Sequence, residues 1–357
     1  MRVAIVHDYL NQYGGAERVL EALHSLFPQA PVYTSIYDPA AMPEHMRSWD
    51  IRTSWMQHLP GWKRFFRAYF LLYPSAFESF DLSSYDLVLS SSSAYAKAII
   101  PGPHTRHICY CHTPMRFAWR TAAYVEREGF GKITRIALSF LLSYLRSWDV
   151  STTKRVHHFI ANSQEVAARI RRSYGREAIV IPPPVDLPAF EETAPGDYYL
   201  AGGRLIPYKR IDLAIQACNA LQLPLKIYGT GRDRAALEVL AGPTIEFVGY
   251  VCEAQRRALF AGCRAFLFPG EEDFGITPLE AMAAGRPVIA YAAGGALDTI
   301  VPGLNGRFFQ QQTAAALAVA IAAERTEHYD ARAIRRYAEG FSTERFLSRI
   351  RAVLEAG

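Results

Sequence analysis

The sequence predicts an α/β protein of two doubly wound domains, and three observations lead to that fold class. Short apolar runs alternate with helix-period segments along the whole chain. The chain has 357 residues, which is about the size of two domains. A run of three prolines at 182–184 interrupts the alternation near the middle. Because half of the residues are hydrophobic, each half of the chain can build its own core.

The apolar runs give the expected strands in order. In the first half, a strand at 3–6 is followed by a helix at 16–26. Further strands in this half are expected at 87–90, 107–110, 159–161 and 179–181. In the second half each strand is followed by a helical pattern, and the expected strands are 198–201, 225–228, 245–248, 265–268 and 288–291. Continuous Val/Ile/Leu runs are typical of strands buried on both faces of a parallel sheet.

The prolines mark the break between the domains. Three prolines in a row cannot continue a helix or a central strand, and a loose acidic stretch follows at 187–197. The prediction is an N-terminal domain at 1–186 and a C-terminal domain at 197–339. Apolar residues at helical spacing within 342–357 follow Ser342, a residue type that caps helices. This last segment is expected to dock as an amphipathic helix.

Charge and cysteine usage exclude several classes of protein. The net charge of +5 suits anionic small molecules or an acidic membrane surface, and it is too small to indicate nucleic acid. The five cysteines form no C-x-x-C pair, which indicates reduced, mostly buried thiols of a cytosolic protein. No signal peptide and no membrane span are expected. The most apolar stretch, 136–145, is predicted to be a core helix.

Ligands of doubly wound sheets bind at the C-terminal ends of the strands, so the loops after the strands hold the candidate sites. The first such loop ends in Gly14 and Gly15 at the mouth of a helix, where small residues and the helix N-terminus suit an anion. A tight strand-to-helix turn explains the same glycines. The loop is not G-x-G-x-x-G, which counts against a nicotinamide-dependent dehydrogenase.

The second loop follows the strand at 198–201 and places cations beside a glycine turn. Gly203 precedes Arg204, and Lys209 follows in the same loop. Two cations at a strand end can clamp a diphosphate, with Arg offering bidentate geometry and Lys a point charge. Ordinary surface solvation is the other explanation of these charges, and the glycine turn disfavours it.

The third loop, after the strand at 265–268, carries the strongest signal. Glu272 lies in this loop, where its carboxylate faces the strand ends. Thr277 is predicted as a helix N-cap, with Pro278 at the first helical position and Glu280 completing a capping box. Glu280 therefore has either a capping role or a binding role. The backbone N–H groups expected to hold a sugar hydroxyl or a phosphate are those of Phe274, Gly275, Ile276 and Thr277.

The two glutamates also suggest a glycosidase, in which two carboxylates flank one glycosidic bond. One of them is expected in a helix cap, however, and the cations call for an anionic ligand. Polyol recognition combined with phosphate binding fits the constellation better. The chain contains no D-x-D motif of the kind that holds a divalent metal on a sugar-nucleotide diphosphate. We therefore expect Arg204 and Lys209 to neutralise the leaving charge, with no metal and no other cofactor.

Together these motifs resemble those of the retaining glycosyltransferases of the GT-B fold, family 4, also called the group 1 glycosyltransferases. The matching features are Gly-Gly-Arg with Lys209, the E-x7-E pair of Glu272 and Glu280, and a Phe-Gly turn before a Pro-Leu-Glu-Ala helix. The resemblance covers essentially the whole chain. The segments 110–116 and 7–17 resemble more narrowly those of bacterial mannosyltransferases of polysaccharide and O-antigen assembly.

The resemblance implies a role for each matching residue. Arg204 and Lys209 would bind the donor diphosphate, Glu272 the donor sugar and Glu280 the ribose. His112, in the motif at 110–116, would contact the donor sugar near its anomeric carbon. The remaining implied donor contacts are the backbone at 274–277, Gly229 along the cleft, Val251 near the nucleobase, and Gly15 from the other domain.

The family also implies an architecture and a mechanism. Two Rossmann-like domains would face a cleft, with the acceptor on the N-terminal domain and the nucleotide sugar on the C-terminal domain. Residues 340–357 would return to the N-terminal domain. Transfer would retain the anomeric configuration, and the departing phosphate would accept the proton of the acceptor. The expected reaction moves a hexose, mannose from GDP-mannose in preference to a UDP-linked donor, to a saccharide or lipid-linked saccharide.

Two other functions are compatible with this fold. A nucleotide-sugar epimerase would convert the donor without any acceptor, and a nucleotide-sugar-binding protein would bind it without turnover. The joint presence of His112, Arg204, Lys209 and Glu272 favours an enzyme over a binding protein.

A basic aromatic segment at 62–73 is the candidate contact with the cytoplasmic face of a membrane. Its aromatic residues have helical spacing and lie beside Lys63, Arg64 and Arg67. A basic amphipathic helix can lie on an anionic bilayer, and a lipid-linked acceptor favours that location. A helix packed within the N-terminal domain, with its charges solvated, explains the same pattern.

Overall fold

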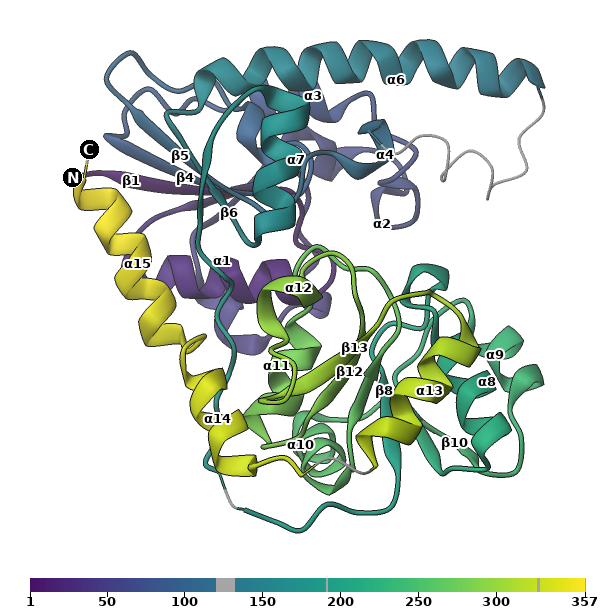
Figure 1. Ribbon diagram of the computed structural model, residues 1–357. Helices are drawn as coiled ribbons and strands as arrows, with labels where there is room; N and C mark the ends of the chain where they lie inside the picture. Colours follow the sequence, from purple (N-terminus) through teal and green to yellow (C-terminus); the bar gives the residue numbers. More distant parts are fainter. Residues whose placement is uncertain (120–131, 191, 326–327, 357) are drawn as a thin grey trace. The chain divides into compact units, whose positions relative to one another are not determined.

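The computed structural model describes residues 1–119, 132–190, 192–325 and 328–356 (Figure 1). The chain forms two compact units. The first unit comprises Met1–Pro183 together with Arg349–Gly357, and the second comprises Pro184–Ser348. Each unit is built on its own parallel sheet, which confirms the predicted α/β class.

The first unit has a seven-stranded sheet in the order β3-β2-β1-β4-β5-β6-β7, and every strand pairing in it is parallel. Its central strands are buried along almost their whole length, although polar residues follow or precede their apolar runs. The strands are β1 (Val3–His7), β2 (Val32–Thr34), β3 (Ile51–Thr53), β4 (Leu87–Ser92), β5 (Arg106–Cys111), β6 (His158–Ala161) and β7 (Ala178–Val180). The sequence predicted five of them and missed β2 and β3, because each is only three residues long and has no extended apolar run.

Helices cover both faces of the first sheet. They are α1 (Gly15–Leu26), α2 (Trp62–Phe65), α3 (Tyr73–Glu78), α4 (Arg116–Trp119), α6 (Lys132–Thr152) and α7 (Gln164–Tyr174), together with the last turns of α15 (Thr343–Glu355). The helices α3, α6 and α7 pack on one face, while α1 and the end of α15 pack on the other (Figure 1).

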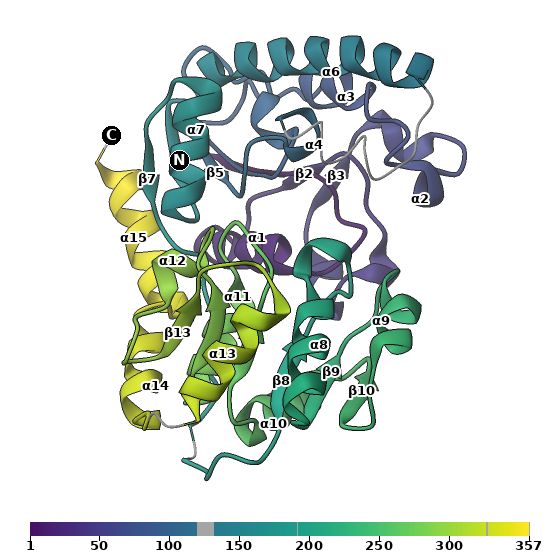
Figure 2. The same cartoon turned by 45° about the vertical axis from the view of Figure 1, so that its right-hand side comes forward.

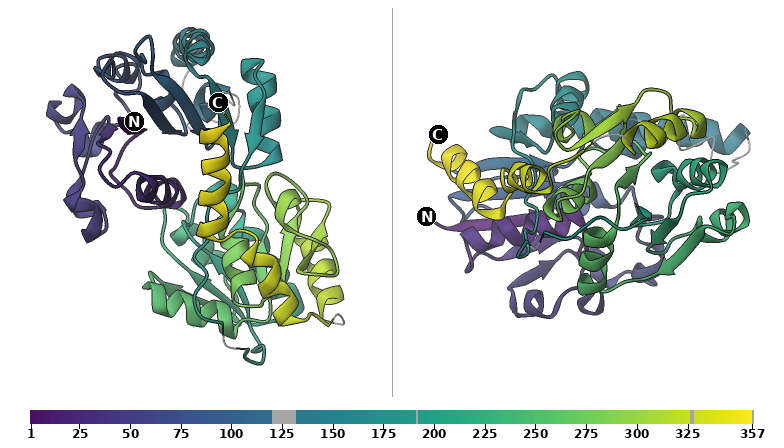
Figure 3. Two further views of the ribbon diagram at one scale, coloured as in Figure 1. Left: turned by 90° about the vertical axis from the view of Figure 1, so that its left-hand side faces the viewer. Right: turned by 60° about the horizontal axis from the view of Figure 1, so that its bottom comes forward.

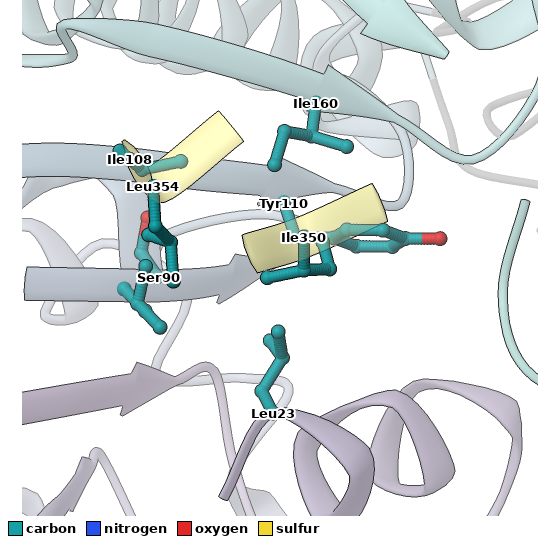
Figure 4. A pocket seen from close by; sticks show the side chains of 8 residues that line it. Leu23, Ser90, Ile108, Tyr110, Ile160, Ile350 and Leu354 are labelled. Atoms are coloured by element: carbon teal, nitrogen blue, oxygen red, sulfur yellow. The ribbon is translucent and has the colours of Figure 1, made fainter. Parts of the chain in front are cut away.

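The end of α15 completes the core of the first unit. Ile350 and Leu354 meet Leu23 of α1 and the sheet residues Ile108 and Ile160 around a cavity of only about 10 Å³ (Figure 4). Arg106 donates hydrogen bonds to the carbonyl oxygens of Val353 and Leu354, at 2.9 and 2.6 Å. The predicted Ser342 cap is also present, because Arg345 N donates to Ser342 Oγ at 3.3 Å. The expected return of residues 340–357 to the N-terminal domain is confirmed for Arg349–Gly357, whereas the residues up to Ser348 belong to the second unit.

The second unit has a six-stranded sheet in the order β10-β9-β8-β11-β12-β13. Its strands are β8 (Tyr199–Gly202), β9 (Leu225–Tyr228), β10 (Ile245–Gly249), β11 (Phe266–Phe268), β12 (Val288–Tyr291) and β13 (Gly306–Phe309). The sequence missed only β13, in which a glycine and an arginine interrupt the apolar pattern. The helices α8 (Ile211–Leu221) and α13 (Ala314–Glu324) cover one face, and α10 (Glu253–Gly262), α11 (Ile276–Ala283) and α14 (Ala331–Glu339) cover the other (Figures 2 and 3). Two short helices, α9 (Arg234–Leu240) and α12 (Ala296–Thr299), complete the unit.

The strand order of the second sheet reverses direction between β8 and β11. The chain adds β9 and β10 on one side of β8, and then crosses over to add β11, β12 and β13 on the other side. The loops that follow β8 and β11 therefore diverge at their carboxyl ends, where open α/β sheets bind their ligands. These are the second and third candidate loops of the sequence.

Residues 62–73 do not form the single helix that the sequence suggested. The helix α2 ends at Phe65, turns follow, and α3 begins at Tyr73. Pro74 lies in the first turn of α3, where it has no N–H with which to continue a helix from the preceding residues. The aromatic side chains that pack against the core of the first unit are Trp62, Phe66, Tyr69 and Tyr73. This packing supports the interpretation of a segment folded into the domain.

The helix α6 is only partly a core element. Leu142 and Leu145 are buried, but Phe140 and Tyr144 on the same helix are 74% and 61% exposed. The prediction of a core helix at 136–145 is therefore wrong for the side that these two aromatic residues occupy. Among the described residues, none of the helices is both long enough and apolar enough to cross a bilayer. The cysteines behave as predicted, since four are buried and all five are free.

Candidate functional site

Lys209 and Glu272 form the centre of the candidate site in the second unit. Lys209 lies in the loop after β8 and Glu272 in the loop after β11, and Lys209 Nζ is 2.6 Å from Glu272 Oε1. The side chains are 11% and 17% exposed. This carboxylate oxygen is buried against the ammonium group of Lys209. The topology thus brings together two residues that are 63 positions apart in the sequence.

The surroundings of Lys209 keep it charged. Burial alone lowers the pKa of its ammonium group, but the Glu272 carboxylate outweighs burial and raises the pKa above its ordinary value. The positive charge of Arg204 acts in the opposite direction and lowers the pKa. Arg204 is exposed, whereas Lys209 is held in place. The site therefore offers one fixed cation and one solvated cation.

Glycines allow the loops at this edge to lie backbone against backbone. Gly229, after β9, has a φ of +103°, and a Cβ atom there would fall 1.9 Å from the carbonyl oxygen of Gly203. Its N–H donates to the carbonyl oxygen of Gly249 at 2.6 Å, which ties the loop after β9 to the end of β10. Val251 follows and is half-buried against the core of the second unit. The predicted contacts at Gly203, Gly229 and Val251 therefore line neighbouring strand ends.

The helix after the acidic loop starts earlier than the sequence suggested. Thr277 is not its N-cap, because α11 begins at Ile276 and its N-cap is Gly275 with a φ of +86°. Only glycine adopts this conformation readily, so the chain turns into the helix before Thr277. Pro278 remains compatible with the first turn, where backbone N–H groups have no intrahelical acceptor. The side chain of Phe274 is buried in the core, so only its backbone can meet a ligand.

Glu280 does not take part in a capping box. It lies in the body of α11, and its Oε1 is 2.6 Å from Arg256 Nη1 of α10. The side chain of Glu280 is 10% exposed. The prediction of a capping role for Glu280 is therefore wrong. An ion pair with Arg256 fixes the position of this carboxylate instead. Its predicted contact with a ribose stays a prediction.

Sequence reasoning missed two supports of the acidic loop. One is Arg256, the partner of Glu280. The other is the pair Gly294-Gly295 after β12: Gly295 N donates to the carbonyl oxygen of Glu272 at 2.9 Å, and a Cβ at Gly294 would lie 2.3 Å from that oxygen. The signal was available, since a Gly-Gly pair in the loop after a predicted strand had already marked the first and second loops.

The first unit holds the remaining predicted residues. Gly14 is the N-cap of α1 and Gly15 its first residue, but the Gly14 N–H already donates to Glu17 Oε2 at 2.8 Å. Glu17 is buried and places a carboxylate at the helix N-terminus where an anion was expected. Gly15 remains exposed. Of the two glycines, only Gly15 keeps an open approach.

His112 follows β5 and is half-buried. Its N–H donates to the carbonyl oxygen of Ser92 at 2.8 Å, and its own carbonyl accepts from Asn162 Nδ2 at 3.0 Å. Its ring nitrogen Nε2 lies 2.8 Å from Ser91 Oγ. Both the backbone and the ring of His112 are therefore fixed at the carboxyl end of β5.

Asp8 supports the same edge of the first sheet, a role that the sequence did not reveal. Its buried carboxylate accepts hydrogen bonds from the backbone N–H groups of Ser93, Ala94, Tyr95 and Ala96, at 2.5 to 3.0 Å. A carboxylate that accepts several N–H groups holds its loop rigidly. Asp8 therefore fixes the loop that follows Ser91 and Ser92.

His107, near the start of β5, makes the first unit sensitive to acid. Burial lowers its pKa to about 3. The unfolded chain takes up a proton below the ordinary pKa of 6.5, whereas the folded chain resists it until pH falls to about 3. The free energy of unfolding should therefore drop by about 1 kcal/mol between pH 7 and pH 5.5 through this residue alone.

Urea unfolding followed by tryptophan fluorescence measures this loss in the first unit, because all five tryptophans lie there. His107→Gln is the control. Its amide can still donate to Arg155 O and accept from Ser90 Oγ, the present partners of the ring at 3.0 and 2.8 Å. The same pH dependence in both proteins would contradict the assignment.

Two family models match nearly the whole chain. The model described as "Glycosyltransferase Family 4" matches residues 13–188, and that described as "Glycosyl transferases group 1" matches residues 190–340. Their boundary lies close to the division between the two units.

Individual relatives agree with these models. A GDP-mannose-dependent alpha-mannosyltransferase of Mycolicibacterium smegmatis is 42% identical over 29% of this chain and 28% of its own length, so the match spans less than a third of that protein. The human alpha-1,3/1,6-mannosyltransferase ALG2 is 24% identical over 82% of this chain and 80% of its own length. The solved structure of Anabaena Alr3699/HepE in complex with UDP superimposes with a TM-score of 0.73 over 100% of both chains, at 17% identity. That likeness concerns the fold.

Proposed function

The chain belongs to the group 1 glycosyltransferases, and from this premise we propose that it transfers mannose from GDP-mannose to a saccharide or lipid-linked saccharide acceptor. The observation that carries the proposal is the Lys209–Glu272 pair, 2.6 Å apart where the loops after β8 and β11 meet. A fixed cation suits a diphosphate, and a neighbouring carboxylate suits sugar hydroxyl groups. Donor binding is therefore assigned to the second unit.

Each group has a defined task in the proposed reaction. Lys209 and Arg204 neutralise the charge that develops on the departing diphosphate, which is an electrostatic form of catalysis. Glu272 orients the donor sugar through its hydroxyl groups, and Glu280 holds the ribose. The departing phosphate accepts the proton of the attacking hydroxyl group, and the anomeric configuration is retained. No metal is required, because the cations of the protein take over the neutralising role.

The similar proteins point to two different donors. The names of the mycobacterial and human relatives specify mannosyl transfer, and the first of them specifies GDP-mannose. The HepE structures contain UDP or UDP-glucose, which makes a UDP-linked sugar the competing donor. Contact with a membrane through residues 62–73 stays a prediction, since four aromatic rings of that segment pack inward.

Calorimetric titration tests the donor and the metal together. We expect GDP and GDP-mannose to bind in excess EDTA at least about tenfold more tightly than UDP and UDP-glucose, a difference of about 1.4 kcal/mol. Preference for the UDP ligands would keep the transferase and overturn the mannose assignment. Binding that appears only after Mg²⁺ or Mn²⁺ is added would overturn metal independence. Conversion of the donor sugar without any acceptor would indicate an epimerase instead.

A further inference from the structure

A row of buried polar side chains leads from α1 to His112 in the first unit. Ser91 Oγ of β4 lies 2.8 Å from His112 Nε2 and 3.1 Å from Nδ1 of His7 on β1. The other ring nitrogen of His7, Nε2, is 3.5 Å from Glu17 Oε1 of α1. His7, Glu17 and Ser91 are 2%, 3% and 0% exposed. Glu17 of α1, His7 of β1, Ser91 of β4 and His112 of the loop after β5 thus form one chain of polar contacts.

The two oxygens of Glu17 set the direction of this chain. Oε2 accepts from the Gly14 N–H at 2.8 Å, and Oε1 faces His7 Nε2. An ionised carboxylate can only accept, so a neutral His7 carries its proton on Nε2 and presents a lone pair at Nδ1.

The single hydroxyl proton of Ser91 then has one destination. It is donated to His7 Nδ1, and Ser91 Oγ accepts in turn from His112 Nε2. A neutral His112 consequently carries its proton on Nε2 and keeps a lone pair on Nδ1. With His7 neutral, the alternative direction requires a donor at the position of Glu17 Oε1, which a carboxylate does not supply. A doubly protonated His7 would donate from both ring nitrogens and reverse the chain, so the relay operates with His7 neutral.

We propose that Glu17, His7 and Ser91 are positioning residues that hold His112 in the Nε2-protonated tautomer. The meaning of this tautomer rests on the proposed function, in which His112 contacts the donor sugar. A lone pair on Nδ1 accepts a hydrogen bond from a sugar hydroxyl group, whereas the opposite tautomer offers a second donor to it. Glu17 of α1 therefore determines the tautomer of His112, although the side chains of His7 and Ser91 lie between them.

The substitution Glu17→Gln reverses the direction of the chain without removing it. The Gly14 N–H still requires an acceptor, so the amide oxygen takes the place of Oε2 and the amide NH₂ group faces His7 Nε2. His7 must then carry its proton on Nδ1 and donate to Ser91, which donates to His112 Nε2. His112 is left with its proton on Nδ1.

The ¹⁵N chemical shifts of the His112 ring nitrogens report the tautomer directly, and His112→Gln assigns the signal. We expect protonated Nε2 in the unmodified protein, protonated Nδ1 in Glu17→Gln, and a mixture in Ser91→Ala. Sugar transfer should fall about tenfold to a hundredfold in both variants, the usual cost of losing an orienting neighbour, mainly through kcat. An unchanged tautomer in both variants would overturn the relay.

Ser90→Ala is the matched control. Ser90 precedes Ser91 on β4, is equally buried, and hydrogen-bonds a different histidine, His107, at 2.8 Å. It should leave the His112 tautomer and transfer unchanged, and equal effects of both serine variants would count against the proposal. If no nucleotide sugar is used by the unmodified protein, the proposed function fails, while the ring-nitrogen shifts still decide whether the relay exists.

Discussion

Lys209→Met should lower sugar transfer by about 10²- to 10³-fold without unfolding the protein. Methionine keeps the length and the apolar stem of the side chain but removes the cation that we assign to the diphosphate. The Glu272 carboxylate loses its 2.6 Å partner and remains only partly exposed, so the position of the donor sugar should suffer as well. The effect should appear in kcat, because a charge that develops in the transition state needs the cation more than the bound donor does.

Arg210→Met is the control for this experiment. Arg210 is the next residue of the same loop and pairs at 3.0 Å with Asp212. It is a cation of the same loop, but no feature of the site assigns it to the donor. Transfer within about twofold of the unmodified protein is expected there. Undiminished transfer in Lys209→Met, or an equal loss in both variants, would refute the role of Lys209.

Glu272→Gln separates the two functions of the pair. If Glu272 serves only to hold Lys209, the double variant Lys209→Met/Glu272→Gln should lose no more activity than Lys209→Met alone. The effects of substitutions at two residues in contact are not additive in that case. If Glu272 also binds the sugar, as we propose, the double variant should lose more. A double-mutant cycle on kcat/KM measures the difference.

The sequence was most informative where each prediction depended on a local pattern. Strands were found wherever apolar residues ran continuously. The strands β2, β3 and β13 were missed because a threonine, an arginine or a glycine interrupts the apolar run in each of them. The site loops were found because parallel strands place their carboxyl ends on one edge, so a loop after a strand is a candidate without any knowledge of packing. The start of α11 was misplaced because Thr277 and Pro278 form a plausible cap, while the positive φ of Gly275 is visible only in three dimensions.

Contacts between distant parts of the chain could not be predicted. The partners Arg256 and Glu280 lie on different helices, and His7 meets Ser91 only because β1 and β4 are neighbours in register. Neither pair has a sequence spacing that signals contact. In residues 62–73 the aromatic residues were recognised from their spacing. The spacing did not reveal whether these side chains contact a bilayer or the core of the protein.

Lys97→Met should produce the largest loss of stability, about 3–5 kcal/mol, in the first unit. Lys97 Nζ lies 2.5 Å from Asp149 Oδ1 and 2.9 Å from Thr152 Oγ1, and the side chains of the ion pair are 1% and 0% exposed. The other carboxylate oxygen of Asp149 accepts from Trp119 Nε1 and Tyr174 Oη at 2.8 and 2.9 Å. Removing the lysine leaves a negative charge in the core that water cannot reach.

Lys63→Met supplies the comparison, because it makes the same substitution in the same unit at an ion pair that solvent reaches. Lys63 Nζ lies 2.9 Å from Asp38 Oδ1, and the side chains of Lys63 and Asp38 are 62% and 19% exposed. Water therefore still reaches the Asp38 carboxylate, and the cost should stay within about 1 kcal/mol. Urea unfolding followed by tryptophan fluorescence reads both variants in the first unit alone. The Lys97–Asp149 and Lys63–Asp38 distances are similar, but the expected losses of stability differ several-fold. The loss depends on whether water can hydrate the carboxylate that remains after the lysine is removed. Equal losses in the two variants would show that the Asp149 carboxylate is either reached by water or protonated once Lys97 is gone.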